Sequence, residues 1–373
     1  MEWKEVRLGD ILNFRRGHDL PHSEMKPGNI PVAGSNGVIG YHDTATPIKP
    51  ILTIGRSGNV GKPYFYEEAW AHNTTLYVDD FKGNDPKFLY YLCQTMPFAN
   101  FGGGSAVPTL NRNHIHPLET KIPVKVDDQR RIASILSSLD RKIELNNKIN
   151  ADLEEMAQAI FKNWFVDFEP FKDGRFVDSE LGMIPEGWKV GSPYEYAKVV
   201  YGAPYKSAKF NDNGEGLPLI RIRDLKDCNP QFYTPEILPQ TEYVNMGDIV
   251  AGMDAEFVPH IWKGNTGLLN QRVCKLMPQQ TSISNLFVLY LMKPELEFVQ
   301  SYKTGTTVSH LGKADIDKFV VVLPPLEVVE ECSKILDSIL QRIKNISAES
   351  RTLSTLRDTL LPRLMSGEIE IPE

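Results

Sequence analysis

The stretch from Gly55 to Pro63 comes closest to a pattern that does chemistry, because a glycine-rich loop that ends in lysine can cradle phosphate groups. The first glycine is one position too far from Gly61, however, and Pro63 stands where such loops carry a metal-binding serine or threonine. None of the eight histidines has metal-ligand spacing, since even His114 and His116 are followed by a proline. These residues therefore predict neither a nucleotide site nor a metal site.

Two shorter fragments leave an enzymatic function open. The segment Asn229-Pro230-Gln231-Phe232 is similar to the Asn-Pro-Pro-Tyr/Phe loop of amino-methyltransferases, but the second proline is missing and no glycine-rich strand-to-helix turn precedes it. Glu119 and Lys121 could form half of a metal-dependent nuclease site, although the upstream Asp79 and Asp80 could equally be solvated turn residues. Since no complete acid–base pair, triad or metal cluster emerges, the sequence favours a binding protein over an enzyme.

Polar, glycine-rich loops recur along the chain, and their residue types suit the recognition of nucleic acid. Glycine lets the backbone approach a ligand closely, and Asn, Ser, Thr, His and Arg side chains bond to base edges and phosphates. Hairpin turns favour the same residues, so any one loop could be only a turn. The candidate DNA-binding residues before residue 128 are Arg15, Arg16, Ser35, Asn36, Arg56, Ser57, Asn59, Lys62, His72, Asn73 and Ser105. Those further along the chain are Tyr205, Lys206, Arg221, Arg223, Asn270, Gln271, Arg272, Thr306, Thr307, Ser309 and His310.

The elements that position these loops follow an internal repeat. The pattern of Gly, Val, Leu and Ile that runs from Gly104 to Ile115 recurs from Gly305 to Ile316, 201 residues later. A period of about 200 residues is far too long for a solenoid and indicates a duplicated module. Each copy consists of a globular part followed by a helical part.

The helical parts carry the clearest pattern. No proline or glycine occurs from Asp128 to Phe165, and apolar residues recur there at steps of three and four, with Asn146 and Asn150 at two seam positions. The second helical part ends near Met365 and contains Pro362, so its last turn should kink or end there. Two matched seams predict that the helices pack on each other as an antiparallel coiled coil, rather than lying separately on the surface.

The globular parts are rich in Gly, Pro, Asn and Tyr, with short β-like runs such as 50–54 and 319–323 between turn signals. One amphipathic helix is expected in each copy, at 86–94 and at 285–292. The expected fold class is mixed α/β (α+β), with pseudo-twofold symmetry between the copies. The predicted order is a first globular domain at 1–127, a long helix at 128–168, a linker at 169–185, a second globular domain at 186–325, a second long helix at 326–365 and a tail at 366–373.

Composition limits the class of protein. Hydrophobic residues make up 41% of the chain, which suffices for globular cores, and no apolar run reaches the roughly 18 residues of a membrane span. The four cysteines lie far apart and the N-terminus has no signal-peptide pattern, so we expect reduced, buried thiols in a cytoplasmic protein. A net charge of −7 argues against a uniformly cationic surface and permits a local basic face.

Six stretches of the chain together form a specific pattern: Trp3–Asp10, Gly34–Gly40, Ile122–Asp140, Ile184–Trp188, Arg221–Leu225 and Leu360–Ile369. On these stretches, and over essentially its whole length, the chain resembles the DNA-sequence specificity subunit of type I restriction–modification systems. The second copy departs from the first because it lacks the Gly-Ser-Asn-Gly loop and has no glutamine at the place that aligns with Gln129.

The resemblance implies a subunit without catalytic activity and without a cofactor of its own. Its two target-recognition domains would each read one half of a bipartite, asymmetric site in double-stranded DNA. Methyltransferase subunits that bind S-adenosylmethionine, and restriction subunits that use ATP and Mg for translocation and cleavage, would be its partners. No membrane is implied.

A second apolar stripe lies off the helical seam. A two-helix coil cannot bury it, and exposed apolar stripes usually mark an interface, although the globular parts could cover it instead. By pseudo-symmetry each end of the coil would take one partner, giving two methyltransferase subunits per chain. The candidate partner-binding residues are Ile135, Met156, Phe161, Phe165, Ile335 and Leu356.

Two other functions stay open from the sequence. A self-contained DNA methyltransferase or nuclease would build on the fragments at Asn229 and Glu119. A purely structural coiled-coil scaffold would use the long helices alone.

Overall fold

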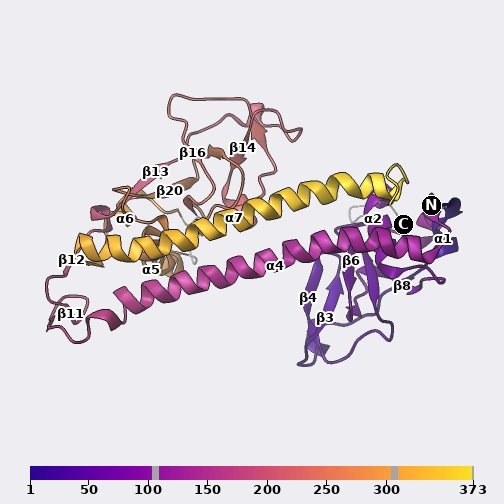
Figure 1. Ribbon diagram of the computed structural model, residues 1–373, viewed down its shortest axis with the longest axis horizontal. Helices are drawn as coiled ribbons and strands as arrows, with labels where there is room; N and C mark the ends of the chain where they lie inside the picture. Colours follow the sequence, from indigo (N-terminus) through magenta and orange to yellow (C-terminus); the bar gives the residue numbers. More distant parts are fainter. Residues whose placement is uncertain (103–108, 304–309, 372–373) are drawn as a thin grey trace. The chain divides into compact units, whose positions relative to one another are not determined.

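The computed structural model describes residues 1–102, 109–303 and 310–371 (Figure 1). The chain forms two compact units: unit 1 comprises Met1–Ile143 and Thr352–Glu373, and unit 2 comprises Glu144–Arg351. Each of the two long helices, α4 (Val126–Phe165) and α7 (Leu326–Met365), has one part in unit 1 and the other part in unit 2. Both helices were expected, and α4 begins two residues earlier and ends three residues earlier than predicted.

Unit 1 contains three small sheets around an apolar core. A four-stranded antiparallel sheet has the order β2-β8-β5-β6, a second sheet has the order β4-β3-β7, and β1 pairs with β9. Its strands are β1 (Trp3–Arg7), β2 (Asn13–Arg16), β3 (Ile30–Gly34), β4 (Gly37–His42), β5 (Ile51–Gly55), β6 (Pro63–Tyr66), β7 (Trp70–Ala71), β8 (Thr75–Asp80) and β9 (Glu119–Pro123). Its other helices are α1 (Leu8–Ile11), α2 (Pro86–Thr95), α3 (Arg112–Ile115) and the 3-10 turns η1 (His22–Glu24) and η2 (Phe98–Phe101).

Unit 2 has the same kind of sheets and a short hairpin in the segment expected to be a linker. Its four-stranded sheets have the orders β13-β20-β17-β18 and β15-β14-β19-β16, while β12 pairs with β21 and β10 with β11. Its strands are β10 (Phe176–Val177), β11 (Ile184–Pro185), β12 (Lys189–Gly191), β13 (Ala197–Tyr201), β14 (Leu217–Ile220), β15 (Tyr233–Thr234), β16 (Tyr243–Val244), β17 (Ile249–Gly252), β18 (His260–Ile261), β19 (Gly267–Leu269), β20 (Val273–Pro278) and β21 (Val321–Leu323). Its other helices are α5 (Asn285–Lys303), α6 (Lys313–Ile316) and the 3-10 turns η3 (Glu169–Phe171), η4 (Pro193–Glu195), η5 (Ser207–Lys209) and η6 (Ile222–Asp224).

Local sequence explains where the principal elements form. All five residues of β5 are buried, which suits its apolar, β-branched sequence as a central strand. Helix α2 begins where the Asp85 side chain accepts a hydrogen bond from the Phe88 amide at 2.8 Å, and its first residue is Pro86. Helix α5 was expected to end at residue 292, but it continues through Pro294 to Lys303, since Leu296 and Val299 are buried in the core of unit 2.

The internal repeat is present in the hydrogen bonding of the backbone. In each unit, the loop after the central strand (β5 or β17) bonds to the turn before the neighbouring strand (β8 or β20) and to the segment before the short helix (α3 or α6). In unit 1, Arg56 N donates to Thr74 O at 2.8 Å, and Leu110 N donates to Arg56 O at 2.7 Å. In unit 2, the matching bonds are Met253 N to Arg272 O at 2.9 Å and Leu311 N to Met253 O at 2.8 Å. The two units therefore share one scaffold at this edge.

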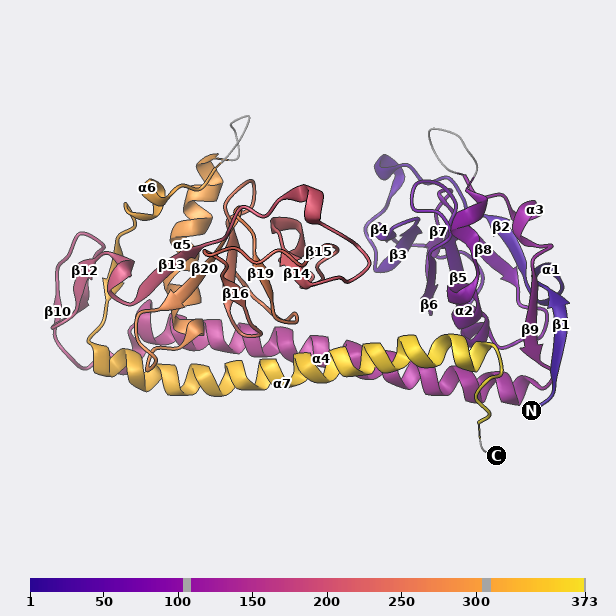
Figure 2. The ribbon, with the colours of Figure 1, turned by 90° about the horizontal axis from the view of Figure 1, so that it is seen from above.

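Helices α4 and α7 pack in antiparallel directions within each unit (Figure 2). In unit 1, Arg357 donates to Asp140 at 2.9 Å. In unit 2, the amide groups of the buried Asn146 and Asn150 donate to Glu349 at 2.8 Å and to Ser347 at 3.1 Å, respectively. Residue numbers fall along α7 as they rise along α4, so the predicted antiparallel packing is confirmed.

Helix α7 ends at Met365, three residues after Pro362, within the last turn where the sequence predicted a kink or an end. A proline in the last turn removes one hydrogen bond, but Leu364 and Met365 are buried in the core of unit 1. The amide of Ser366 then donates to the Pro362 carbonyl at 2.9 Å and closes the helix.

Candidate nucleic-acid interface

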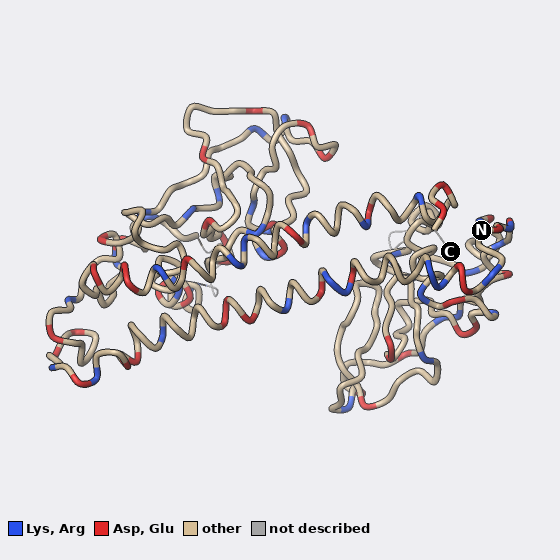
Figure 3. Tube along the Cα trace, viewed as in Figure 1, with Lys and Arg blue, Asp and Glu red and all other residues tan. Residues whose placement is uncertain are grey.

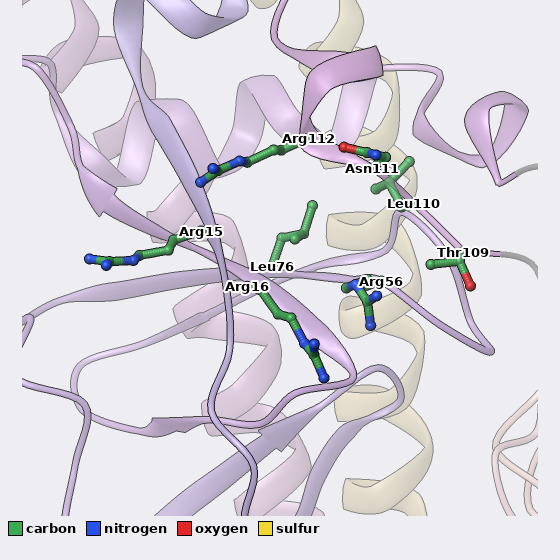
Figure 4. A pocket seen from close by; sticks show the side chains of 8 residues that line it. All are labelled: Arg15, Arg16, Arg56, Leu76, Thr109, Leu110, Asn111 and Arg112. Carbon is green, nitrogen blue, oxygen red and sulfur yellow. The ribbon is translucent and has the colours of Figure 1, made fainter.

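Unit 1 has a hollow of about 410 Å³ lined by four arginines (Figure 4). Arg15 and Arg16 are at the end of β2, Arg56 is in the loop after β5, and Arg112 begins α3. The sequence predicted the first three as DNA-binding residues. The other lining residues are Leu76, Thr109, Leu110 and Asn111.

The arginines of this hollow carry more positive charge than their acidic partners neutralise. Arg15 pairs with Asp79 at 3.5 Å, and Arg16 pairs with Asp19 at 3.7 Å. In the part of the chain that the structure describes, neither of the other two arginines has a carboxylate partner. They donate to main-chain carbonyls instead: Arg56 to Asn73 O at 3.4 Å and Arg112 to Phe14 O at 3.2 Å. Two positive charges are therefore left to attract an anion.

The lowered pKa of Arg56 reflects the same excess of positive charge. Partial burial lowers the pKa of Arg56, and the positive charge of Arg16 lowers that pKa further. A guanidinium remains protonated despite such a shift, so the repulsion between the two arginines persists in the folded protein. A phosphate placed between them would relieve this repulsion and accept their hydrogen bonds.

The polar loops around the hollow lie close to one another. Ser35 and Asn36 form the two-residue turn of the β3–β4 hairpin, followed by Gly37 with a φ of +98°. A Cβ placed on Gly55 would be 1.8 Å from the carbonyl oxygen of Asn59 and 3.2 Å from that of Ser35. Glycine at this position therefore allows the predicted loops at 35–36 and 56–59 to meet at one edge of unit 1.

The third predicted loop of unit 1, at residues 72–74, joins the same network. Burial lowers the pKa of His72, so its ring is neutral at pH 7, and its Nδ1 lies 3.0 Å from the hydroxyl of Thr74. The amide of Asn73 donates to Asp19, the carboxylate that also pairs with Arg16. Lys62 is exposed and lies 5.4 Å from the ring of Tyr64.

At the corresponding edge of unit 2, the side chains are different. Arg272 Nε lies 3.4 Å from one oxygen of Asp254, and His310 Nδ1 lies 2.7 Å from the other. Arg272 Nη1 lies 3.5 Å from His310 Nδ1. We call these three residues the Arg–Asp–His cluster of unit 2. Asn270 and Gln271 belong to the same turn, where Gln271 N donates to the Asn270 side chain at 2.8 Å.

The shared backbone pairing shows which positions correspond. The Arg–Asp–His cluster occupies the positions of Thr74, Ser57 and Thr109 in unit 1. Conversely, the four arginines of the hollow in unit 1 correspond to Val200, Tyr201, Met253 and Lys313 in unit 2. The same scaffold therefore presents a strongly cationic hollow in one unit and a nearly neutral polar cluster in the other.

Two predicted binding residues of unit 2 form hydrogen bonds with other residues of the protein. Tyr205 is buried and donates its hydroxyl hydrogen to Thr241 at 3.0 Å. Arg221 donates from Nε and Nη2 to both oxygens of Asp224, at 3.1 and 3.2 Å, and stacks on Phe232. These contacts engage the Tyr205 hydroxyl and the Nε and Nη2 of Arg221 within the protein, and DNA binding by these two residues stays a prediction. Arg223 and Lys206 are exposed.

The expected apolar stripe on the long helices is only partly exposed. Met156, Ile335 and Leu356 are exposed, with 53%, 42% and 45% of their surface accessible. The exposure expected of Phe161 and Phe165 is wrong, because both are buried in the core of unit 2. They pack against Phe287 of α5, with ring centroids 5.6 and 5.2 Å apart. Ile135 is half-buried and packs on the core of unit 1.

Among the residues of these sites that the sequence did not predict are Asn111, Arg112 and Asp254. Asn111 and Arg112 directly follow Leu110 of the repeated pattern, so the repeat itself could have identified them. Asp254 corresponds to Ser57 only through the backbone pairing, and no motif marks it. The predicted Ser105, Thr306, Thr307 and Ser309 lie outside the described residues.

Other kinds of site find no support over residues 1–102, 109–303 and 310–371. No group of three or more potential metal ligands occurs there. No helix in these ranges combines the length and the apolar character needed to cross a membrane. The four cysteines are unpaired and buried, as expected. Both long helices contain Lys and Arg as well as Asp and Glu, so positive charge is not confined to either helix (Figure 3).

Known proteins resemble this chain in both sequence and fold. The type I restriction enzyme MjaIX specificity subunit of Methanocaldococcus jannaschii is 27% identical over 318 residues, which cover 77% of this chain and 70% of that protein. The type I restriction enzyme HindI specificity subunit of Haemophilus influenzae is 23% identical over 445 residues, covering 98% and 94%. The crystal structure of the type I restriction–modification system S subunit from M. genitalium has a similar fold, with a TM-score of 0.59 at 15% identity and coverage of 100% and 97%.

A family of domains matches both copies of the internal repeat. It is described as the type I restriction modification DNA specificity domain, and it matches residues 1–155 and 185–353. These two ranges contain the hollow of unit 1 and the Arg–Asp–His cluster of unit 2, respectively. The chain therefore belongs to the family of type I restriction modification DNA specificity domains.

Proposed function

We propose that this chain is a non-catalytic DNA-recognition subunit that reads a bipartite, asymmetric sequence in double-stranded DNA. One observation carries the proposal: a shared backbone scaffold presents unlike side chains in the two units. Base edges are read by specific donors and acceptors, so unlike sets of side chains select unlike half-sequences. Two such half-sites, separated by an unspecified spacer, make up the proposed target.

Phosphate contacts would supply much of the affinity. The excess positive charge of the hollow in unit 1 suits the DNA backbone, while Asn36, Arg223 and Arg272 offer the side-chain types that read bases. Because the chain has a net charge of −7, affinity should depend on these local contacts and fall steeply with salt.

We further propose that the chain brings two methyltransferase subunits and restriction subunits to this DNA site. The exposed Met156, Ile335 and Leu356 on the long helices support docking there, because exposed apolar side chains on a helix favour an interface. S-adenosylmethionine, ATP and Mg would bind to those partners, and this chain would hold no cofactor.

Selection from a random duplex library tests the recognition function. The full chain with its methyltransferase subunits should enrich two unlike half-sequences at a constant separation. Inserting one base pair into the spacer should abolish binding by the assembled complex, since it changes both the distance and the rotation between the two half-sites. Unchanged affinity after this insertion would refute bipartite recognition.

A titration with S-adenosylmethionine separates this proposal from an enzymatic one. The chain alone should show no binding in calorimetry, whereas the assembled complex should bind it. Tight one-to-one binding to the chain alone would instead support a self-contained methyltransferase.

A further inference from the structure

We infer that Arg272 reads a guanine in the half-site of unit 2, and that Asp254 and His310 hold its guanidinium in place. This inference rests on the proposed function and specifies one base of the target. It also assigns roles to three side chains that come from separate segments of unit 2.

The arrangement of the cluster leaves the terminal amines of Arg272 available. Asp254 lies 3.4 Å from the Nε of Arg272, and its other oxygen lies 2.7 Å from Nδ1 of His310. The shorter contact requires that Nδ1 carry a hydrogen and donate it to the carboxylate. That nitrogen therefore cannot accept a hydrogen bond from Nη1 of Arg272, 3.5 Å away. Among the residues that the structure describes, no acceptor is bonded to Nη1 or Nη2, so these amines form a pair of parallel donors.

Main-chain bonds fix the backbone positions of the three residues relative to one another. The amide of Met253, next to Asp254, donates to the carbonyl of Arg272 at 2.9 Å. The amide of Leu311, next to His310, donates to the carbonyl of Met253 at 2.8 Å. An antiparallel bridge also joins Asp254 to His310. An arginine held in this way loses less conformational freedom when it binds, which improves both affinity and specificity.

Charge favours a base over a phosphate as the ligand of Arg272. Asp254 balances the guanidinium, so the Arg–Asp pair is close to neutral, and a phosphate would also meet the negative carboxylate. Guanine offers two neutral acceptors, O6 and N7, which match the paired amines of arginine. Adenine replaces O6 with an amino donor and would leave one amine of Arg272 without an acceptor.

The side chain of Arg272 is accessible enough for this role. It retains 54% of its exposure, while the side chain of Asp254 retains 31% and that of His310 retains 45%. In unit 1 the corresponding positions carry Thr74, Ser57 and Thr109, which cannot form a bidentate arginine contact. This guanine is therefore expected in only one of the two half-sites.

Selection of duplexes by the assembled complex, repeated with variants, tests the inference. The parent should enrich one guanine that Arg272→Ala no longer selects, with the preference over other bases falling about 5- to 150-fold, the range of one bidentate contact. Arg272→Lys should also lose most of this preference, because lysine binds as a point charge. Asp254→Asn should weaken selection at the same position and leave the other positions unchanged. Glu256→Gln is the matched control and should select like the parent. It removes another carboxylate from the same loop as Asp254, and this carboxylate lies 3.6 Å from His260.

The outcomes separate this inference from the proposed function. If the parent enriches no sequence, recognition itself is refuted. If the parent enriches a bipartite sequence and Arg272→Ala keeps every base preference, only the assignment of Arg272 is wrong. An equal loss of affinity on all duplexes, with a lower salt dependence, would identify a phosphate contact and overturn the assignment to guanine. A change at every position in Asp254→Asn would overturn its positioning role.

Discussion

Replacing Arg56 with alanine tests the hollow of unit 1 as a phosphate site. Arg15 and Arg16 of the hollow pair with aspartates, whereas Arg56 has no carboxylate partner among the described residues. Each phosphate neutralised on duplex DNA contributes about 0.9 to the slope of log affinity against log salt concentration. Between about 1 M and about 0.15 M salt, this slope raises the affinity from one such contact roughly fivefold, or by about 1 kcal/mol. Arg56→Ala should therefore lose about this much on every duplex.

Fluorescence anisotropy with labelled duplexes, measured from low to high salt, gives both quantities. The slope of log affinity against log salt concentration is negative, and for Arg56→Ala it should be less steep than for the parent by about 0.9, on selected and unselected duplexes alike. Lys121→Ala is the matched control, since Lys121 is also an exposed cation of unit 1, pairs with Glu5 at 3.2 Å and does not line the hollow. An unchanged slope, or a loss confined to the selected duplex, would refute the assignment of Arg56 to a phosphate.

Three further predictions follow from contacts within the units. Phe161→Asp should unfold unit 2 in denaturant titrations, because it buries an unpaired charge, whereas Leu356→Asp should stay folded and lose the methyltransferase subunit in pull-downs. Asp140→Ala should lower the free energy of unfolding of unit 1 by about 2–4 kcal/mol, since it removes the partner of both Tyr91 and Arg357. In a double-mutant cycle, additive losses of stability for Asp140→Ala and Arg357→Ala would contradict this coupling. Burial raises the pKa of Tyr66 to about 12, so the stability that its neutral phenol contributes is present below pH 10 and is lost as the pH rises toward 12. In thermal unfolding, Tyr66→Phe should therefore lose less stability at alkaline pH than the parent. Identical pH profiles for the two proteins would contradict this prediction.

Local sequence patterns determined the two long helices and the alternation of globular and helical parts along the chain. The steps of three and four in the apolar residues predicted both long helices and their antiparallel packing, including the buried seam positions of Asn146 and Asn150. Helical periodicity is a property of neighbouring residues, so it can be read without knowing the rest of the fold. It did not show what covers the helix, which is why Phe161 and Phe165 were wrongly expected at the surface.

Only the tertiary structure decided which polar residues act together. Sequence composition marked Arg15, Arg56 and Arg272 as candidates, but it did not distinguish them from Arg221, which is bonded to Asp224. The offset between corresponding residues also changes along the chain, from 185 between Arg16 and Tyr201 to 201 at the repeated pattern. Loops of different length produce these offsets, while the hydrogen bonds between strands keep the corresponding positions together in space. The pairing of Asp254 with Arg272 and His310 depends on those long-range bonds, and no local pattern contains them.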